Sequence, residues 1–249
     1  MNRLSLLTGV LACLMVLLAA LGAVCGAVDQ IATDAQFYSG MSRAAVAKHL
    51  NVENDPQADE KVTEYIGMDN AAQTAFAGEM AAFMRGEAER QPDILSADEQ
   101  QHMRDVRGLT QRAAQLSKTL MTFAAVLAVV IAWTGAKLKR RLLPEAIGGL
   151  SALTLLAVLA YGVISRMNAG GFADMFVKMH EMLFTNDLWL MDPQTDILIR
   201  MMPQPLFEQA LVHGAGLALR LFVIVCVMLL AVQFIVGRMI RTHVTREDK

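Results

Sequence analysis

The sequence predicts an all-α polytopic membrane protein with four transmembrane helices under a mainly helical extracytoplasmic cap. The 249-residue chain is 55% hydrophobic and its mean hydropathy is +0.39, which is outside the usual range of a soluble domain. Its apolar residues gather in four runs without a charge, each close to the roughly 20 residues that a helix needs to cross a bilayer. These runs are Leu4–Val28, Thr119–Ala136, Ala146–Ser165 and Leu221–Gly237.

The orientation of the four helices follows from lysine and arginine in the short connections. Basic residues fill the loop between the second and third runs and recur in the C-terminal tail, so both segments are expected to be cytoplasmic. Of the 24 acidic residues, all but Glu145, Glu247 and Asp248 lie in or beside the two remaining connections, which we place outside. The predicted organisation is 1–28 transmembrane helix 1, 29–118 extracytoplasmic cap, 119–136 transmembrane helix 2, 137–145 cytoplasmic loop, 146–166 transmembrane helix 3, 167–205 extracytoplasmic interfacial segment, 206–238 transmembrane helix 4 and 239–249 cytoplasmic tail.

The first apolar run has two interpretations, a cleaved signal peptide or a retained anchor. It exceeds the 7–15 apolar residues of a typical signal peptide, and Cys25-Gly26-Ala27 is a poor cleavage site, so we favour the anchor. All three cysteines (Cys13, Cys25 and Cys226) lie in predicted spans, which gives no disulfide framework and no thiol nucleophile outside.

Within the cap, short helices are predicted for Ser42–Leu50 and Asp59–Met68. The clearest local signal is the capping box of Ser96 and Glu99, which opens a further helix. A break near Gly108 is expected to lay this helix along the membrane surface.

The capping-box helix carries a histidine with acidic neighbours. His102 shares a face with Val106, while Asp98 lies four residues before it and Asp105 three residues after it. Either carboxylate could accept a ring N–H and orient the imidazole.

The second outer segment predicts an amphipathic helix over Phe172–Phe184 that lies in the membrane interface. His180 points with the apolar residues, one turn from both Phe176 and Phe184. Trp189 suits the same depth. A further turn or helix is expected at Asp196–Met202, and the fourth span begins near Leu206.

The fourth span has two polar residues on one face, His213 and Arg220. Arg220 falls at the outer hydrocarbon boundary, where it either snorkels or anchors a lipid or carbonyl group. His213 is either a helix-packing residue or part of a substrate contact.

The usual hydrolytic and metal motifs are absent from the sequence. There is no Gly-x-Ser-x-Gly elbow, and His180-Glu181 lacks the second histidine of a zinc protease. Each outer histidine, His102 or His180, is therefore either a packed structural residue or a catalytic group in an apolar environment.

Two blocks resemble the bacterial lipoprotein intramolecular transacylase family, Lit. One is Leu95–Leu109 with its His-Met-x-Asp-Val core. The other contains Phe172, Phe176, His180, Phe184, Trp189, Asp192-Pro193, Asp196, Leu198-Ile199, Pro203 and Phe207.

The resemblance implies four spans under an extracellular cap in the bacterial plasma membrane, with the site facing outside. It implies that His102 and His180 are the catalytic pair, and that the sn-2 acyl chain of a diacylated lipoprotein moves to the α-amine of its own N-terminal cysteine. The nucleophile then belongs to the substrate, and histidine and an α-amine titrate closely enough for proton transfer.

The substrate would contact Phe176, Phe184, Trp189, His213 and Arg220, and five methionines are expected to form an adaptable wall for acyl chains. These are Met175, Met179, Met182, Met201 and Met202. The expected partners are a diacylated lipoprotein and membrane lipid, with no nucleic acid, cofactor or metal; the oligomeric state is left open. Two alternatives remain: a non-enzymatic membrane protein whose cap binds lipid or a protein partner, and, less favoured, a small transporter.

Overall fold

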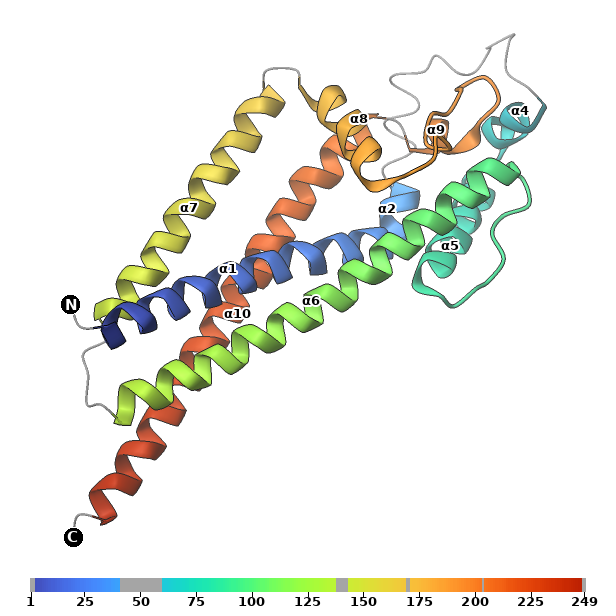
Figure 1. Cartoon of the computed structure of the whole chain (residues 1–249). Coiled ribbons are helices and arrows are strands. Elements are labelled where there is room, and N and C mark those ends of the chain that lie inside the picture. Colours follow the sequence, from blue (N-terminus) through green and yellow to red (C-terminus); the bar gives the residue numbers. More distant parts are fainter. Residues whose placement is uncertain (1–2, 41–59, 138–142, 169–170, 203, 248–249) are drawn as a thin grey trace. The chain divides into compact units, whose positions relative to one another are not determined.

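The computed structural model describes residues 3–40, 60–137, 143–168, 171–202 and 204–247, and all regular elements in these ranges are helices (Figure 1). The predicted all-α class is confirmed for this part of the chain, and the predicted helix Ser42–Leu50 lies outside it. The helices are α1 (Arg3–Ala32), α2 (Ala35–Gly40), α4 (Glu60–Gly67), α5 (Asn70–Arg85), α6 (Ala97–Lys137), α7 (Leu143–Asn168), α8 (Phe172–Leu183), α9 (Ile197–Met201) and α10 (Gln204–Glu247).

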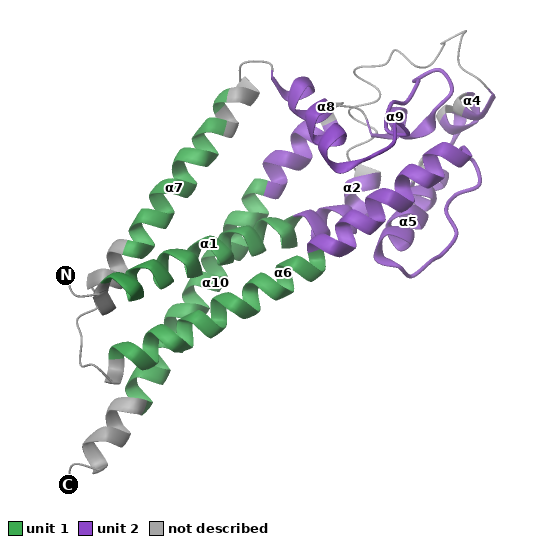
Figure 2. Ribbon diagram, viewed as in Figure 1, with its two compact units in different colours: residues 1–27, 114–169, 215–249 green, residues 28–113, 170–214 purple. Residues whose placement is uncertain are grey.

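The chain divides into two compact units, coloured separately in Figure 2. Unit 1 contains Met1–Ala27, Ala114–Ala169 and Ala215–Lys249. Unit 2 contains Val28–Ala113 and Gly170–Gly214, so most of the predicted cap and of the second outer segment belongs to one compact body. Helices α1, α6 and α10 contribute residues to both units.

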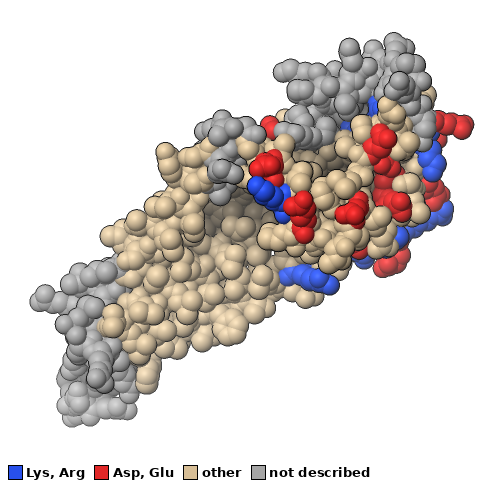
Figure 3. All heavy atoms as spheres, turned by 45° about the horizontal axis from the view of Figure 1, so that its top comes forward, with Lys and Arg blue, Asp and Glu red and all other residues tan. Residues whose placement is uncertain are grey.

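Three described helices are long and apolar enough to cross a membrane: Leu6–Ala32, Ala97–Gly135 and Leu206–Met239. Helix α7 holds a shorter apolar stretch, Gly148–Gly162. Their outward side chains are mostly large and aliphatic, as expected where lipid is the solvent. In the view of Figure 3, the coloured lysine, arginine and acidic side chains gather in one region, and much of the tan surface carries none.

Unit 1 is packed through small residues. Ala19 of α1 and Ala124 and Ala128 of α6 are completely buried together, which lets the helix backbones approach closely. The Ser117 hydroxyl donates to the carbonyl oxygen of Gly22 at 2.8 Å.

The pairing of α1 with α7 depends on a glycine. A Cβ at Gly148 would overlap the backbone carbonyl of Gly9, whereas the adjacent Gly149 faces open space. This contact requires glycine at position 148 because the obstacle is backbone, which cannot rotate away.

Unit 2 has a core of aromatic and methionine side chains, to which α2, α4, α5, α6 and α9 contribute. Met201 is 1% exposed in this core and Met202 packs against it. The expectation that Met201 lines an acyl-binding wall is therefore wrong: it is one of the residues that hold α9 in place. The core members are Tyr38, Tyr65, Phe76, Ala77, Met80, Ala81, Phe83, Met84, Leu95, Met103, Ile197, Leu198 and Met201.

Helix α6 has no break at Gly108, which corrects the sequence-based expectation (Figure 1). One glycine inside a helix costs only about 1 kcal/mol relative to alanine, and neighbouring contacts offset it. The guanidinium of Arg107 lies 4.7 Å from the Phe83 ring centroid, and the Thr110 hydroxyl donates to the Arg107 carbonyl at 3.0 Å. These contacts stabilise the helical backbone on both sides of Gly108.

Candidate active site

His102 is positioned by the start of α6. The predicted capping box is confirmed: the Ser96 hydroxyl accepts from the Glu99 N–H at 3.2 Å, and the Glu99 carboxylate accepts from the Ser96 N–H at 2.7 Å. The second Glu99 oxygen accepts from the backbone N–H groups of Ile197 and Leu198 at 2.6 and 2.7 Å. Glu99, only 1% exposed, therefore begins two helices and joins α6 to α9.

His180 is positioned by α8, the predicted amphipathic helix. Phe172, Phe176 and His180 follow at four-residue intervals and share one face; Phe172 and His180 are buried. Nδ1 of His180 lies 2.8 Å from the carbonyl oxygen of Phe176. Because a carbonyl oxygen only accepts, the proton resides on Nδ1, and Nε2 is left with its lone pair.

Unit 2 brings the two histidines together. Their ring centroids are 6.2 Å apart with an interplanar angle of 27°, although 78 residues separate them in the chain (180 − 102). That separation is within reach of shared acid–base work on one substrate.

Aromatic rings enclose the pair. Phe176 and Trp189 lie 4.2 and 5.1 Å from His180, and Phe184 lies 5.0 Å from His102 and 5.6 Å from His180. Phe207 of α10 packs against Phe176 at 4.9 Å. The chain is only 6% aromatic, and four of its aromatic residues lie around the histidines.

Burial keeps both imidazoles neutral. It lowers the pKa of His102 to about 4, with a further lowering by His180 and an opposing contribution from the Asp105 charge. Burial also lowers the pKa of His180, and its hydrogen bond to the Phe176 carbonyl partly opposes this. Nδ1 of His102 is buried and has no hydrogen-bond partner among the described residues. An unpaired lone pair is tolerated better than an unpaired N–H, which favours the proton on Nε2.

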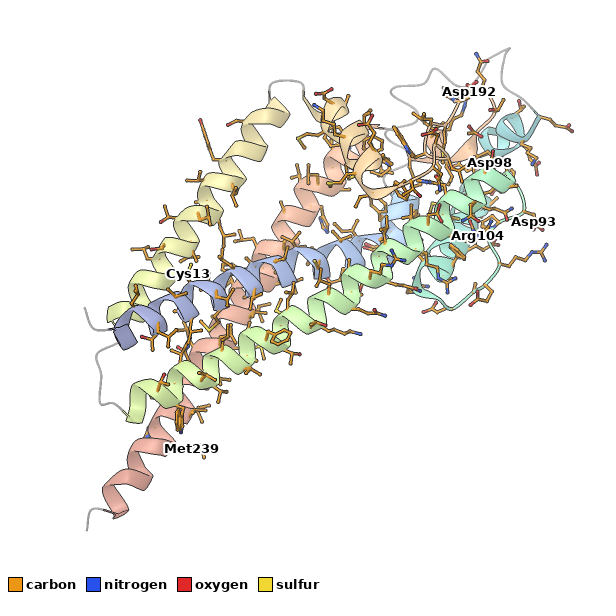
Figure 4. All side chains as sticks on the ribbon, in the orientation of Figure 1. Cys13, Asp93, Asp98, Arg104, Asp192 and Met239 are labelled. Atoms are coloured by element: carbon orange, nitrogen blue, oxygen red, sulfur yellow. The ribbon has the colours of Figure 1, made fainter. Side chains whose placement is uncertain are left out.

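The two acids that were expected to orient His102, Asp98 and Asp105, differ in their surroundings. Asp98 is exposed near the beginning of α6 (Figure 4), and no hydrogen bond joins it to His102 among the described residues. Asp105 is half-buried and accepts from the side-chain amides of Gln101 at 2.9 Å and Asn186 at 3.0 Å. Asp105 therefore acts on His102 through its charge, and its hydrogen bonds hold the α8–α9 connection.

Of the two polar residues of α10, His213 belongs to unit 2 and Arg220 to unit 1. His213 is exposed within unit 2 and contacts neither histidine in the described part of the chain; Arg220 is exposed within unit 1. Their predicted substrate contacts remain predictions.

Three residues were missed as site components. Glu99 was expected only to cap its own helix, Asn186 carried no sequence signal, and Phe207 was part of the quoted motif without a role. Within the described residues, no group of three or more His, Cys, Asp or Glu side chains is arranged to hold a metal ion.

Comparison with known proteins gives a fold and a family. A solved structure, the membrane-integral lipoprotein intramolecular transacylase Lit from Bacillus cereus, matches with a TM-score of 0.59 at 15% identity, covering 97% of this chain and all of that one. At this identity the match establishes the fold. No curated protein matches the chain. The model of the family "Lipoprotein intramolecular transacylase Lit" matches residues 13–207, more than half of the chain. The protein therefore belongs to the Lit family of membrane lipoprotein transacylases, which are acyltransferase-type enzymes.

Proposed function

We propose that this protein transfers the sn-2 acyl chain of a diacylglyceryl-cysteine lipoprotein to the α-amine of the same cysteine, giving the N-acyl, lyso form. The observation that carries the proposal is the stacked, buried pair of His102 and His180, with ring centroids 6.2 Å apart inside an aromatic enclosure. Family membership supports the reaction class, and the geometry of the two histidines supports one acting as the base and the other as the acid.

His180 is the general base in this proposal. Its Nδ1–H donates to the Phe176 carbonyl, so Nε2 has the free lone pair. The substrate amine nitrogen attacks the ester carbonyl carbon and forms the new amide bond, and His180 takes the proton that the nitrogen loses.

His102 is the general acid. Its Nε2 proton passes to the glyceryl oxygen as the carbon–oxygen ester bond breaks. In the same step the protonated His180 transfers the proton from the amine to His102, so that no imidazolate is formed. The net result is one proton moved from nitrogen to oxygen, and the enzyme ends in its starting state.

The aromatic enclosure would exclude water, so that the amine rather than water attacks the ester. Because amine and ester belong to one molecule, holding them together avoids much of the entropic cost of a bimolecular encounter, up to ~7–11 kcal/mol for well-aligned groups. The enzyme then needs no nucleophile of its own.

We further propose that α7 is a fourth membrane span and that the site faces outward from the plasma membrane. The Gly148–Gly9 approach supports a place for α7 beside α1, and the basic residues of 137–141 and of the C-terminal tail support cytoplasmic ends. Residues 138–142 lie outside the described ranges, so this orientation depends on the sequence.

The test is expression of the chain in a bacterium that makes only diacylated lipoproteins, followed by tandem mass spectrometry of the lipoprotein N-terminal peptides, in which the fragment masses locate each acyl chain. The expected result is conversion to the N-acyl, lyso form, and its loss in H102Q and in H180Q, which keep side-chain size and polarity but cannot carry the proton. K178A is the matched control, because Lys178 is exposed on the same helix as His180 and forms an exposed ion pair with Asp174 at 3.0 Å. Lipoproteins that keep both acyl chains on the glyceryl group in the presence of the intact, membrane-inserted protein would contradict the proposal.

A further inference from the structure

We propose that Asn186 is a positioning residue that, with Asp105, holds the aromatic part of the α8–α9 connection over the two histidines. This inference rests on the proposed transacylase function for its kinetic consequences, but the structural arrangement can be measured without activity.

Both polar atoms of the Asn186 side-chain amide form a hydrogen bond. Its Nδ2 donates to Asp105 at 3.0 Å, and its Oδ1 accepts from the Leu188 N–H at 3.2 Å. The other Asp105 oxygen accepts from Gln101 Nε2 at 2.9 Å, and Gln101 accepts in turn from Arg104 at 3.0 Å. A chain of side-chain hydrogen bonds thus runs from the exposed face of α6, where Figure 4 labels Arg104, to the connection after α8.

This series of hydrogen bonds ends beside the aromatic residues that contact the two histidines. Asn186 follows Phe184 by two residues and precedes Trp189 by three, and these rings contact His102 and His180 at 5.0 and 5.1 Å. Asp105 lies less than one helical turn from His102 on α6. The Asp105–Asn186 bond therefore fixes both sides of the enclosure relative to each other across 81 residues of sequence.

The connection from Thr185 to Asp196 has no helix of its own and is largely exposed. Its hydrogen bonds at Asp192–Asp196 and from Arg200 to Pro193 lie toward α9, whereas the Asn186–Asp105 bond joins its beginning to α6. Without the bond to Asp105, the backbone turn at Asn186–Leu188 loses its link to α6. A misplacement of about 1 Å at reacting groups lowers a rate by about 100-fold, and we expect a loss of this order when the link is removed.

The two partners differ in charge, which makes their roles separable. Asp105 supplies a hydrogen-bond acceptor and also a negative charge that raises the pKa of His102 against the effect of burial. Asn186 supplies only the hydrogen bonds. N186A therefore removes the link and leaves the titration of His102 nearly unchanged, whereas D105N also lowers the pKa of His102 further.

The decisive variant is the swap D105N/N186D. In the swap, residue 105 accepts from Gln101 with its oxygen and donates with its nitrogen to the new carboxylate at 186, whose second oxygen accepts from Leu188. All three hydrogen bonds persist, and only the position of the charge changes. In either single variant at least one pair is lost, because D105N sets two amide donors against each other and N186D sets two carboxylates against each other.

The experiment measures lipoprotein conversion rates and, separately, hydrogen exchange of the peptide spanning residues 184–190, in detergent-purified full-length protein. We expect N186A, N186D and D105N each to slow conversion by ~10- to 100-fold and to accelerate exchange, and the swap to restore both to within several-fold of wild type. A swap no better than the worse single variant in exchange would overturn the inference, whether or not the protein is active. Restored exchange with unrestored conversion would also overturn it, because the charge rather than the link would then be what catalysis requires. Absence of conversion by the wild type would refute the proposed function alone.

Discussion

The substitution E99Q tests how the two segments of unit 2 are joined. The Glu99 carboxylate accepts three backbone N–H groups, from Ser96, Ile197 and Leu198, at 2.7, 2.6 and 2.7 Å. Glutamine has nearly the same shape but only one acceptor. One of the carboxylate's two binding positions would then present an NH₂ group to a backbone N–H.

The expected loss in the free energy of unfolding follows from the number of hydrogen bonds that Glu99 accepts. Hydrogen bonds to a charged group contribute roughly 1.5–3 kcal/mol each, and leaving a buried donor unpaired costs about 1–3 kcal/mol. If the oxygen stays with Ile197 and Leu198, two bonds lose their charge assistance and one N–H is stranded. A total of about 3 kcal/mol is expected, within the range for breaking a buried polar network.

Two measurements separate this loss from a general charge effect. The first is unfolding of the purified protein in mild detergent with added urea. The second is hydrogen exchange of the peptide spanning residues 196–202, where the Ile197 and Leu198 amides should lose protection. D98N is the matched control: Asp98 is exposed in the same first turn, so it reports only the favourable interaction with the helix dipole, about 0.3–1 kcal/mol. Equal destabilisation by E99Q and D98N, with protection at α9 unchanged, would refute the reasoning.

Two further predictions concern the histidine pair and the helix packing. The pKa of His102 is about 4 in the folded protein and near 6.5 in the unfolded chain. NMR titration should therefore show a neutral His102 at pH 6, and the free energy of unfolding should fall as the pH decreases from 6.5 toward 4. A His102 titration midpoint at or above 6.5 would contradict the burial argument. In thermal unfolding in detergent, G148A should destabilise the protein by about 1–3 kcal/mol, because its Cβ meets the Gly9 carbonyl. G149A should be neutral or slightly stabilising in the same measurement, because position 149 faces open space. Equal effects of the two alanines would argue against the α1–α7 contact.

Much of the local structure was predictable because it depends on short-range patterns. The capping box, the helix after Ser96 and the amphipathic helix of His180 each follow from residues a few positions apart, and the structure confirms them. The expected break at Gly108 was wrong because propensity alone cannot register the contacts of Arg107 and Thr110.

The arrangement of the site depends on contacts between distant residues, which no local pattern reveals. The bonds from Glu99 to α9 and from Asn186 to Asp105 span 98 and 81 residues. The resemblance to a family selected His102 and His180, and the structure adds their separation and the hydrogen-bond environment from which their tautomers are inferred. The role of Asp105 changed for the same reason: its sequence distance from His102 suggested a hydrogen bond, but its oxygens are used by two amides.

The most direct test of the central claim is the number of fatty acids that mild alkali releases from a lipoprotein N-terminal peptide before and after incubation with the purified protein. Intramolecular transfer leaves the total mass unchanged and moves one acyl chain from ester to amide, so mild alkali should release one fatty acid instead of two. We predict that result for the wild type and two alkali-released fatty acids for H102Q and H180Q. Release of two fatty acids after incubation with the folded wild-type protein, or an activity that persists in either histidine variant, would contradict the account.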